Sequence, residues 1–363
     1  MQINRHHIQD HDLFLAEHEA SLLAPRLGAM KIGVILPAAE ADGPDETPGW
    51  PAIRSFARTA EALGLDSVWM FDHLFDQTED GSIEGMHEAW TIVSAVAATT
   101  ERVEIGTLVM CSSFRSPGLM AKMAVTADEV SDGRLILGLG AGWHDPEYDA
   151  FGFPTDHRVA RFEEALKITV ALLRGERVTF AGSYHTTRDA RLVPSARHRI
   201  PVLVAGEGPR MLRLAARHAD AWNTAWYGAP DERLSRQLAA LRGALESEGR
   251  DPAMIMRTVG MIVRDPEVDQ CSDDDEFAGS VEELAHAINA YESVGIDHLI
   301  VLLQPMTEPS LDRLGAALER RADLEPSPQG AGRTEGSVTT EREAHRGLPS
   351  RGSDGQTAAG APS

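Results

Sequence analysis

Residues 67–75 read SVWMFDHLF, and this stretch indicates a buried strand that ends in reactive side chains. The apolar run from Val68 to Phe71 is unbroken, which suits a strand covered on both faces, as in a parallel sheet. It stops at Asp72 and His73, an acid beside an imidazole. Parallel sheets covered by helices carry their chemistry at the carboxyl ends of the strands, so the pair is a candidate site. The alternative interpretation is that Asp72 caps a loop and that His73 is a surface histidine.

Similar apolar segments recur along the chain, and helical periodicity follows each of them. Strands are expected at 31–36, 67–71, 103–110, 134–139, 201–205, 220–223, 256–263 and 298–303. Helices are expected at 53–64, 88–100, 119–130, 158–173, 210–218, 232–248, 280–291 and 309–320, and a hairpin at 177–187. This alternation predicts an α/β fold, a (β/α)8 TIM barrel with an excursion after the fourth strand.

A doubly wound open sheet is the rival fold, and it needs a glycine-rich turn after its first strand. Here the first strand runs into Leu36-Pro37-Ala38, so the barrel is preferred. We expect it to span residues 30–322. The polar segment 1–29 is expected to be a loose N-terminal extension. The segment 323–363, rich in Pro, Gly, Ser, Thr and Glu, is expected to be a disordered tail.

Composition narrows the classes of function. The net charge is −22, from 34 basic and 56 acidic residues. Such a charge argues against binding of nucleic acid or an anionic membrane, so any phosphate site must be local. The 2 cysteines make no disulfide framework, which fits a cytoplasmic protein. No apolar run reaches about 20 residues, so no membrane span is expected. The histidine spacing does not match a metallohydrolase barrel, and no metal is expected.

Two further strand ends are rich in glycine. Gly206-Glu207-Gly208 follows the fifth strand and precedes a helix, where free amides and the helix dipole favour phosphate. Arg210 and Arg213 add positive charge nearby. Gly140-Ala141-Gly142 follows the fourth strand, which implies that a flat or bulky group lies against the backbone. The alternatives are an ordinary turn and tight packing of the barrel.

Five blocks of sequence carry a resemblance to a known family. They read KIGVIL, AEALGLDSVWMFDHLF, VEIGTLVMCSSFRSPGLMAK, DEVSDGRLILGLGAGW and IPVLVAGEGPRMLRLAARHADAWN, in that order. The chain resembles the bacterial luciferase-like flavin oxidoreductase family, especially its deazaflavin (coenzyme F420)-dependent branch, over about residues 30–322. The resemblance implies a cofactor at the mouth of the barrel.

The resemblance also implies roles for single residues. His73 falls at the position of a catalytic histidine near the cofactor ring. Leu108–Val109 matches a non-proline cis peptide bond that forms a bulge behind that ring. The other implied cofactor-binding residues are Asp72, Cys111, Gly140, Ala141, Gly142, Gly206, Glu207 and Gly208, the last three at the phosphate.

One residue departs from part of that family. Members that oxidise sugar phosphates carry a glutamate where this chain has Trp143, directly after Gly142. Trp143 argues against a sugar-phosphate substrate and suggests an apolar wall of a substrate pocket; core packing is the alternative. Substrate is expected to enter beneath the loops 37–50, 76–86 and 145–199.

The resulting hypothesis is an F420-dependent oxidoreductase that transfers hydride to or from a small organic substrate. One alternative is an FMN-dependent monooxygenase, such as an alkanesulfonate monooxygenase, which would need a flavin reductase as partner. The other is a barrel that binds flavin without turnover. The chain is expected to form a homodimer.

Overall fold

The computed structural model describes residues 29–40, 47–78, 81–266 and 275–324. The expected N-terminal extension and C-terminal tail lie almost wholly outside the described residues, so those two predictions stay untested. No helix within the described ranges is long and apolar enough to cross a membrane.

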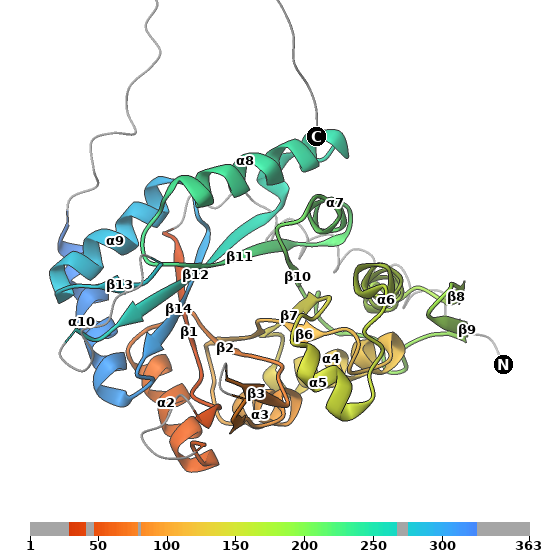
Figure 1. The fold of residues 1–363 in the computed structure, drawn as a ribbon, viewed down its shortest axis with the longest axis horizontal. Helices are drawn as coiled ribbons and strands as arrows, with labels where there is room; N and C mark the ends of the chain where they lie inside the picture. Colours follow the sequence, from red (N-terminus) through yellow and green to blue (C-terminus); the bar gives the residue numbers. More distant parts are fainter. Residues whose placement is uncertain (1–28, 41–46, 79–80, 267–274, 325–363) are drawn as a thin grey trace, which may run out of the picture. The chain divides into compact units, whose positions relative to one another are not determined.

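Parallel strands close into the expected (β/α)8 barrel (Figure 1). Neighbouring strands pair in the order β1–β2–β5–β7–β10–β11–β12–β14, and β14 pairs back to β1. The barrel strands are β1 (Lys31–Ile35), β2 (Ser67–Met70), β5 (Glu104–Thr107), β7 (Leu135–Gly140), β10 (Val202–Ala205), β11 (Ala221–Tyr227), β12 (Met256–Arg264) and β14 (His298–Gln304).

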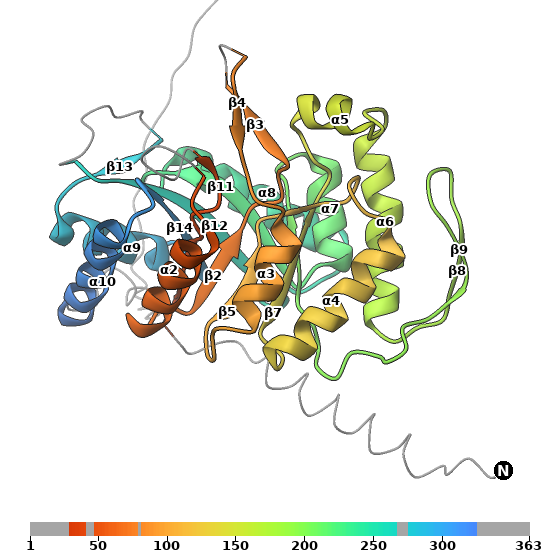
Figure 2. The same cartoon turned by 90° about the horizontal axis from the view of Figure 1, so that it is seen from below.

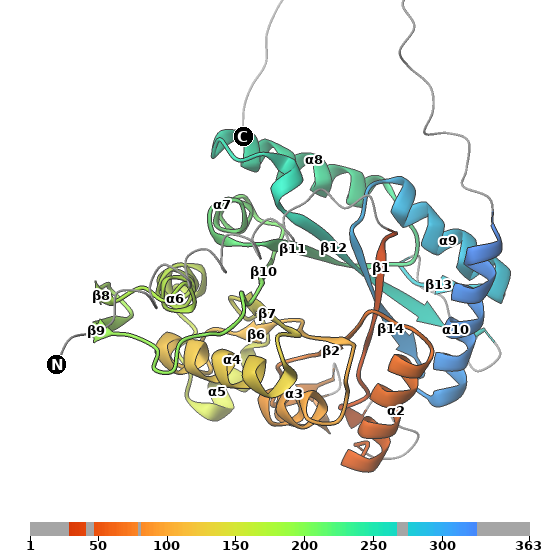
Figure 3. The same cartoon turned by 180° about the vertical axis from the view of Figure 1, so that it is seen from behind.

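Helices cover the outside of this ring, as Figures 1 and 3 show from opposite sides. They are α2 (Trp50–Ala62), α3 (Ala89–Ala97), α4 (Pro117–Ser131), α6 (Arg158–Leu173), α7 (Pro209–His218), α8 (Glu232–Ser247), α9 (Val281–Ser293) and α10 (Glu308–Asp323). The excursion after β7 contains α5 (Asp145–Phe151), α6 and the hairpin β8 (Val178–Ala181) and β9 (Thr186–Ala190). A 3-10 turn, η2 (Pro252–Met254), precedes β12, and β13 (Phe277–Ala278) pairs with the end of β12.

The barrel interior is filled by side chains. Trp69 is fully buried, and its ring occupies the space that a side chain at Gly106 would need. The indole Nε1 of Trp69 donates to Ser67 Oγ at 2.7 Å, and His298 Nε2 lies 2.7 Å from the same oxygen. The Ser67 hydroxyl thus joins Trp69 and His298 in one buried polar network inside the barrel.

Several short elements and one interrupted strand differ from the expectation. The segment 76–86 was expected as a loop, but β3 (Phe75–Gln77) and β4 (Ile83–Gly85) pair as a hairpin there. The helix α5 was not expected. The third predicted strand is interrupted after β5 and resumes as β6 (Met110–Cys111). Figure 2 shows the β3–β4 hairpin and α5 rising on the same side of the barrel.

Candidate active site

A cavity of about 920 Å³ opens at the carboxyl ends of the strands. It is lined by residues in or after the carboxyl-terminal parts of all eight barrel strands, which places most of the predicted site residues around one space. They are Asp72, His73, Leu108, Val109, Cys111, Gly140, Ala141, Gly142, Trp143, Gly206 and Glu207. Gly208 is not part of this lining; it is the N-cap of α7.

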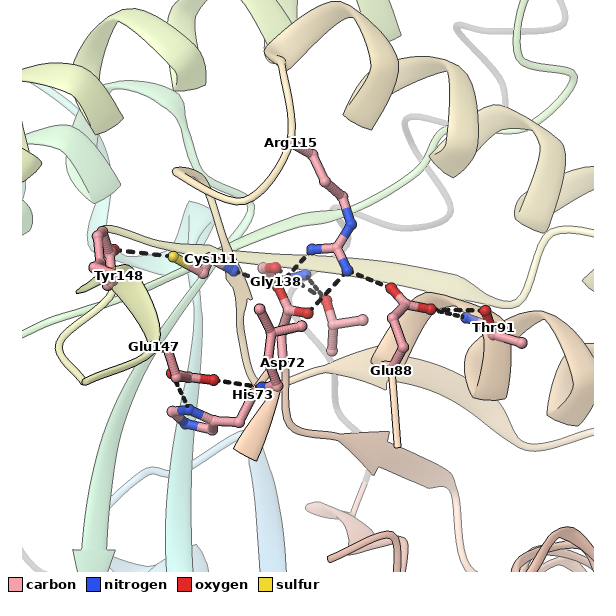
Figure 4. A network of polar contacts seen from close by, with 11 residues as sticks. Asp72, His73, Glu88, Thr91, Cys111, Arg115, Gly138, Glu147 and Tyr148 are labelled. Atoms are coloured by element: carbon pink, nitrogen blue, oxygen red, sulfur yellow. Dashed lines mark hydrogen bonds and ion pairs between the residues drawn. The ribbon is translucent and has the colours of Figure 1, made fainter. Parts of the chain in front are cut away.

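His73 is held by a buried acid that comes from α5. Its Nδ1 lies 2.9 Å from Glu147 Oε2, and the side chain of Glu147 is 1% exposed. The other oxygen of Glu147 accepts the backbone N–H of Leu74 (Figure 4). One carboxylate therefore fixes both the imidazole of His73 and the backbone directly after it.

Asp72 turns to a different partner. Arg115 donates to its two oxygens at 2.7 and 3.0 Å, and the Cys111 amide donates at 2.8 Å. Arg115 also binds Glu88, the N-cap of α3 (Figure 4). Burial lowers the pKa of Arg115, but its bonds to Asp72 and Glu88 outweigh this and leave the pKa raised. Burial raises the pKa of Asp72, and the bonds from Arg115 oppose that rise.

The peptide bond Leu108–Val109 is cis, which confirms the bond that the resemblance implies. It lies at the interruption between β5 and β6. A Cβ at Gly140 would lie 2.6 Å from Cγ2 of Val109, so Val109 fills the space beside this glycine. The group that lies against the backbone at Gly140 is therefore the Val109 side chain, which fits the alternative of tight packing of the barrel at this glycine.

Gly142 makes room for Tyr148, which lines the same cavity. Its φ is +79°, and a Cβ there would lie 1.9 Å from Tyr148 Oη. That hydroxyl donates to the Ala141 carbonyl at 3.0 Å and lies 3.1 Å from Cys111 Sγ. Burial raises the pKa values of both the Cys111 thiol and the Tyr148 phenol, which keeps both groups protonated near neutral pH.

The loop before α7 has two distinct glycines. Gly206 has φ +145°, and a Cβ there would lie 2.9 Å from Met211 Cβ. Nothing lies within 4 Å of a Cβ at Gly208, whose backbone is extended. The carboxylate of Glu207 is engaged within the protein, because it accepts hydrogen bonds from Thr224 Oγ1 at 2.5 Å and from Gln237 Nε2 at 3.1 Å. Arg210, expected as positive charge for the loop, is paired with Glu163 at 2.7 Å.

Trp143 stands at the mouth of the cavity, 68% exposed, so the alternative of core packing is wrong. Its ring centroid lies 5.4 Å from that of His73, at an interplanar angle of 74°. It also lies edge-on to His144, at 5.1 Å. This indole adds an open aromatic surface next to the imidazole.

Glu147, Arg115 and Tyr148 are among the residues of the site that the sequence analysis does not predict. Glu147 and Tyr148 lie on α5, which begins with Pro146 near its N-terminus. Proline and acids at this position are a helix-start signal that was available in the sequence. No signal distinguishes buried Glu147 from exposed Asp145 and Asp149, because only the fold decides which acid turns inward.

Comparison with known proteins agrees with this architecture. The model of the luciferase-like monooxygenase family matches residues 30–273. An F420-dependent secondary alcohol dehydrogenase, solved with an F420–acetone adduct, has a TM-score of 0.69 at 20% identity and covers 81% of this chain and 99% of its own. A riboflavin lyase, solved with modified FMN and riboflavin, has a TM-score of 0.67 at 16% identity, with 81% and 92% covered. At these identities the likeness concerns the fold.

Curated relatives share more of the sequence. The F420-dependent glucose-6-phosphate dehydrogenase of Microbacterium testaceum (strain StLB037) is 33% identical over 216 residues, which are 59% of this chain. The phthiodiolone/phenolphthiodiolone dimycocerosates ketoreductase of Mycobacterium kansasii is 33% identical over 229 residues, 58% of this chain. The chain spans 62% of the length of each of these two relatives.

Proposed function

The chain belongs to the luciferase-like monooxygenase family, and from this premise we propose that it is an F420-dependent oxidoreductase acting on a small organic substrate. The observation that carries the proposal is one cavity that joins a histidine, held by a buried carboxylate, to the glycine-lined ends of β7 and β10. Two curated relatives that act on different substrates, a dehydrogenase and a ketoreductase, support redox chemistry at such a site. The dehydrogenase is named as F420-dependent, which supports the deazaflavin as the cofactor.

The residues present fit such a cofactor. A volume of about 920 Å³ is at the large end of the usual range for ligand pockets, so both a ring system and a substrate have room. At the start of α7, Pro209 has no N–H, while the amides of Arg210 and Met211 precede the first intrahelical donor, Leu212. The open space at Gly208 lets a phosphate approach these amides.

The protein's own part in the reaction is to position groups and to hold a proton. The deazaflavin supplies hydride transfer when it is bound. His73, oriented by Glu147, is placed to exchange a proton with a substrate oxygen in the cavity. Trp143 offers its ring to the apolar part of a substrate next to that histidine.

FMN in place of F420, a flavin reductase partner, a homodimer and a cytoplasmic location stay predictions. So do the cofactor contacts of Asp72, Cys111 and Ala141. Asp72 lines the cavity, and its carboxylate accepts hydrogen bonds from Arg115 and from the Cys111 amide.

The cofactor is tested by titrating the purified protein with F420 and with FMN side by side, followed by absorbance and fluorescence. We expect F420 to bind and its spectrum to change when a suitable alcohol or ketone is added. Binding of FMN alone, with oxygen uptake by the reduced form, would support the monooxygenase instead. Tight binding with no substrate-dependent change in spectrum would support a non-catalytic flavin carrier.

Replacement of His73 tests its catalytic role. We expect His73→Asn to keep a donor near Glu147 and to leave F420 affinity unchanged, since the phosphate loop lies on another strand. Turnover should fall by ~10²–10⁴-fold, the usual loss of a positioned acid or base. Stopped-flow reduction of F420 measures both quantities. Reduction at the parent rate would make His73 only a surface histidine at the cavity mouth.

A further inference from the structure

Glu147 is a buried carboxylate without a conventional cation. Its side chain is 1% exposed, and His73 is the only titratable side chain at ion-pair distance from it in the part of the chain that the structure describes. A buried carboxylate is stable only when hydrogen-bond donors satisfy it. The Leu74 amide satisfies Oε1, so Oε2 requires its donor from His73 (Figure 4).

This requirement selects one form of the imidazole. A neutral histidine carries a proton on one ring nitrogen and a lone pair on the other. If the proton is on Nδ1, it is donated to Glu147 at 2.9 Å, and the lone pair is on Nε2. The opposite form would set the lone pair of Nδ1 against a carboxylate oxygen, which is repulsive. The hydrogen bond at one ring nitrogen thus fixes what the other can do.

We propose that Glu147 is a positioning residue that locks His73 as the Nδ1–H tautomer, so that Nε2 is the proton acceptor of the site. When a substrate hydroxyl gives up its proton, the O–H bond breaks and an N–H bond forms at Nε2. The resulting imidazolium carries a positive charge next to the Glu147 carboxylate, which stabilises it, as the buried aspartate does in a Ser-His-Asp triad. The tautomer follows from the geometry alone, while the proton acceptor role rests on the proposed function.

The variant Glu147→Gln separates this role from simple packing. A glutamine has one oxygen and one NH2 group on a side chain of the same shape. The Leu74 N–H can be satisfied only by the oxygen, so the NH2 must face Nδ1 of His73. Nδ1 would then have to accept, and the imidazole proton would move to Nε2. The variant should therefore invert the tautomer with little change of structure.

The experiment uses the full chain without cofactor, labelled with ¹⁵N-histidine. Long-range ¹H–¹⁵N spectra at about pH 9, well above the pKa of about 6.5 of an ordinary histidine, distinguish the two tautomers. The His73 signals are assigned by their loss in His73→Asn. We expect Nδ1–H in the parent protein and Nε2–H in Glu147→Gln. The exposed acid Asp149, on the same helix, gives a matched control, and Asp149→Asn should leave the parent spectrum unchanged.

An Nε2–H tautomer in the parent protein would overturn the proposal without any variant, so the test does not depend on folding of Glu147→Gln. The same tautomer in the parent and in a folded Glu147→Gln would also overturn it. Once a substrate is known, Glu147→Gln should lower turnover by ~10–100-fold, as loss of an orienting partner does, with F420 affinity unchanged. If the parent protein turns over no substrate, the proposed function fails while the tautomer result stands.

Discussion

Two neighbouring residues, Asp72 and His73, leave the end of β2 toward different partners. Asp72 is bound by Arg115 and His73 by Glu147, in keeping with the opposite directions of successive side chains at a strand end. The sequence predicted the pair and its place. It did not predict either partner, because Arg115 and Glu147 come from later segments whose paths depend on the whole barrel.

We expect the ion pair between Asp72 and Arg115, at the edge of the site, to stabilise the fold. In Asp72→Asn, the charge that compensates the partly buried Arg115 is reduced to that of Glu88 alone. We expect the free energy of unfolding to fall by about 3 kcal/mol, the lower end of the loss on breaking a buried ion pair. Urea denaturation measures it.

An exposed ion pair provides the control for Asp72→Asn. Glu232 and Arg236 form a pair on α8 in which both side chains are largely exposed. Glu232→Gln should leave the denaturation midpoint unchanged, since such pairs contribute little. Equal midpoints for the two variants would mean that Asp72 and Arg115 do not stabilise the fold.

The phosphate loop gives a prediction for one element, the start of α7. Gly208→Val places its side chain in open space at an ordinary φ of −70°, so the fold should be retained. The same side chain would block the approach of a phosphate to the helix amides, and F420 affinity should fall by about 1–3 kcal/mol. Equilibrium titration of F420 fluorescence measures this, and unchanged affinity would remove the loop from the site.

Gly206 serves as the comparison, because its replacement should destabilise the fold whereas that of Gly208 should not. Gly206→Ala forces a side chain into φ +145° and against Met211, so it should lower the thermal unfolding midpoint. Because Gly206→Ala is expected to disturb the fold, a loss of F420 affinity in this variant would not show that Gly206 contacts the cofactor. If both variants unfolded at the same lowered temperature, the distinction between the two glycines would be wrong.

Elements differed in how well the sequence predicted them. The helix α6 has the predicted bounds, Arg158–Leu173, because one face of apolar residues packs on the barrel and its period is visible. The β3–β4 hairpin was not predicted because its strands are only three residues each and at least partly exposed, so no alternation marks them. The barrel strands could be predicted without alternation, because strands buried on both faces appear in the sequence as continuous apolar runs.

At the scale of the whole molecule, the charged residues around the cavity affect which substrates can bind. Among the described residues between the end of each barrel strand and the start of the next outer helix (α2, α3, α4, α6, α7, α8, α9 or α10), Arg115 is the only lysine or arginine. Asp72 and Glu88 bind it. Arg158, the first residue of α6, is paired with Asp145. At the end of β12, Arg264 lines the cavity, and Glu276 binds it at 2.6 and 2.8 Å. Cations near the cavity are therefore engaged by the protein's own acids, and the net charge of the chain is −22.

This charge distribution predicts selectivity against anionic substrates. Two matched pairs test it, glucose against glucose 6-phosphate and benzyl alcohol against 4-(hydroxymethyl)benzoate, each measured by F420 reduction. The neutral member should give the higher kcat/KM in both pairs, because a buried anion without a cation partner is costly. The disadvantage of the anion should shrink as salt rises, since screening weakens repulsion by the surrounding acids. Trp143→Ala should lower kcat/KM for benzyl alcohol by about tenfold, the equivalent of one aromatic contact, and should leave glucose unaffected. A preference for glucose 6-phosphate over every neutral alcohol would show that Arg264 or Arg115 leaves its carboxylate to bind the substrate.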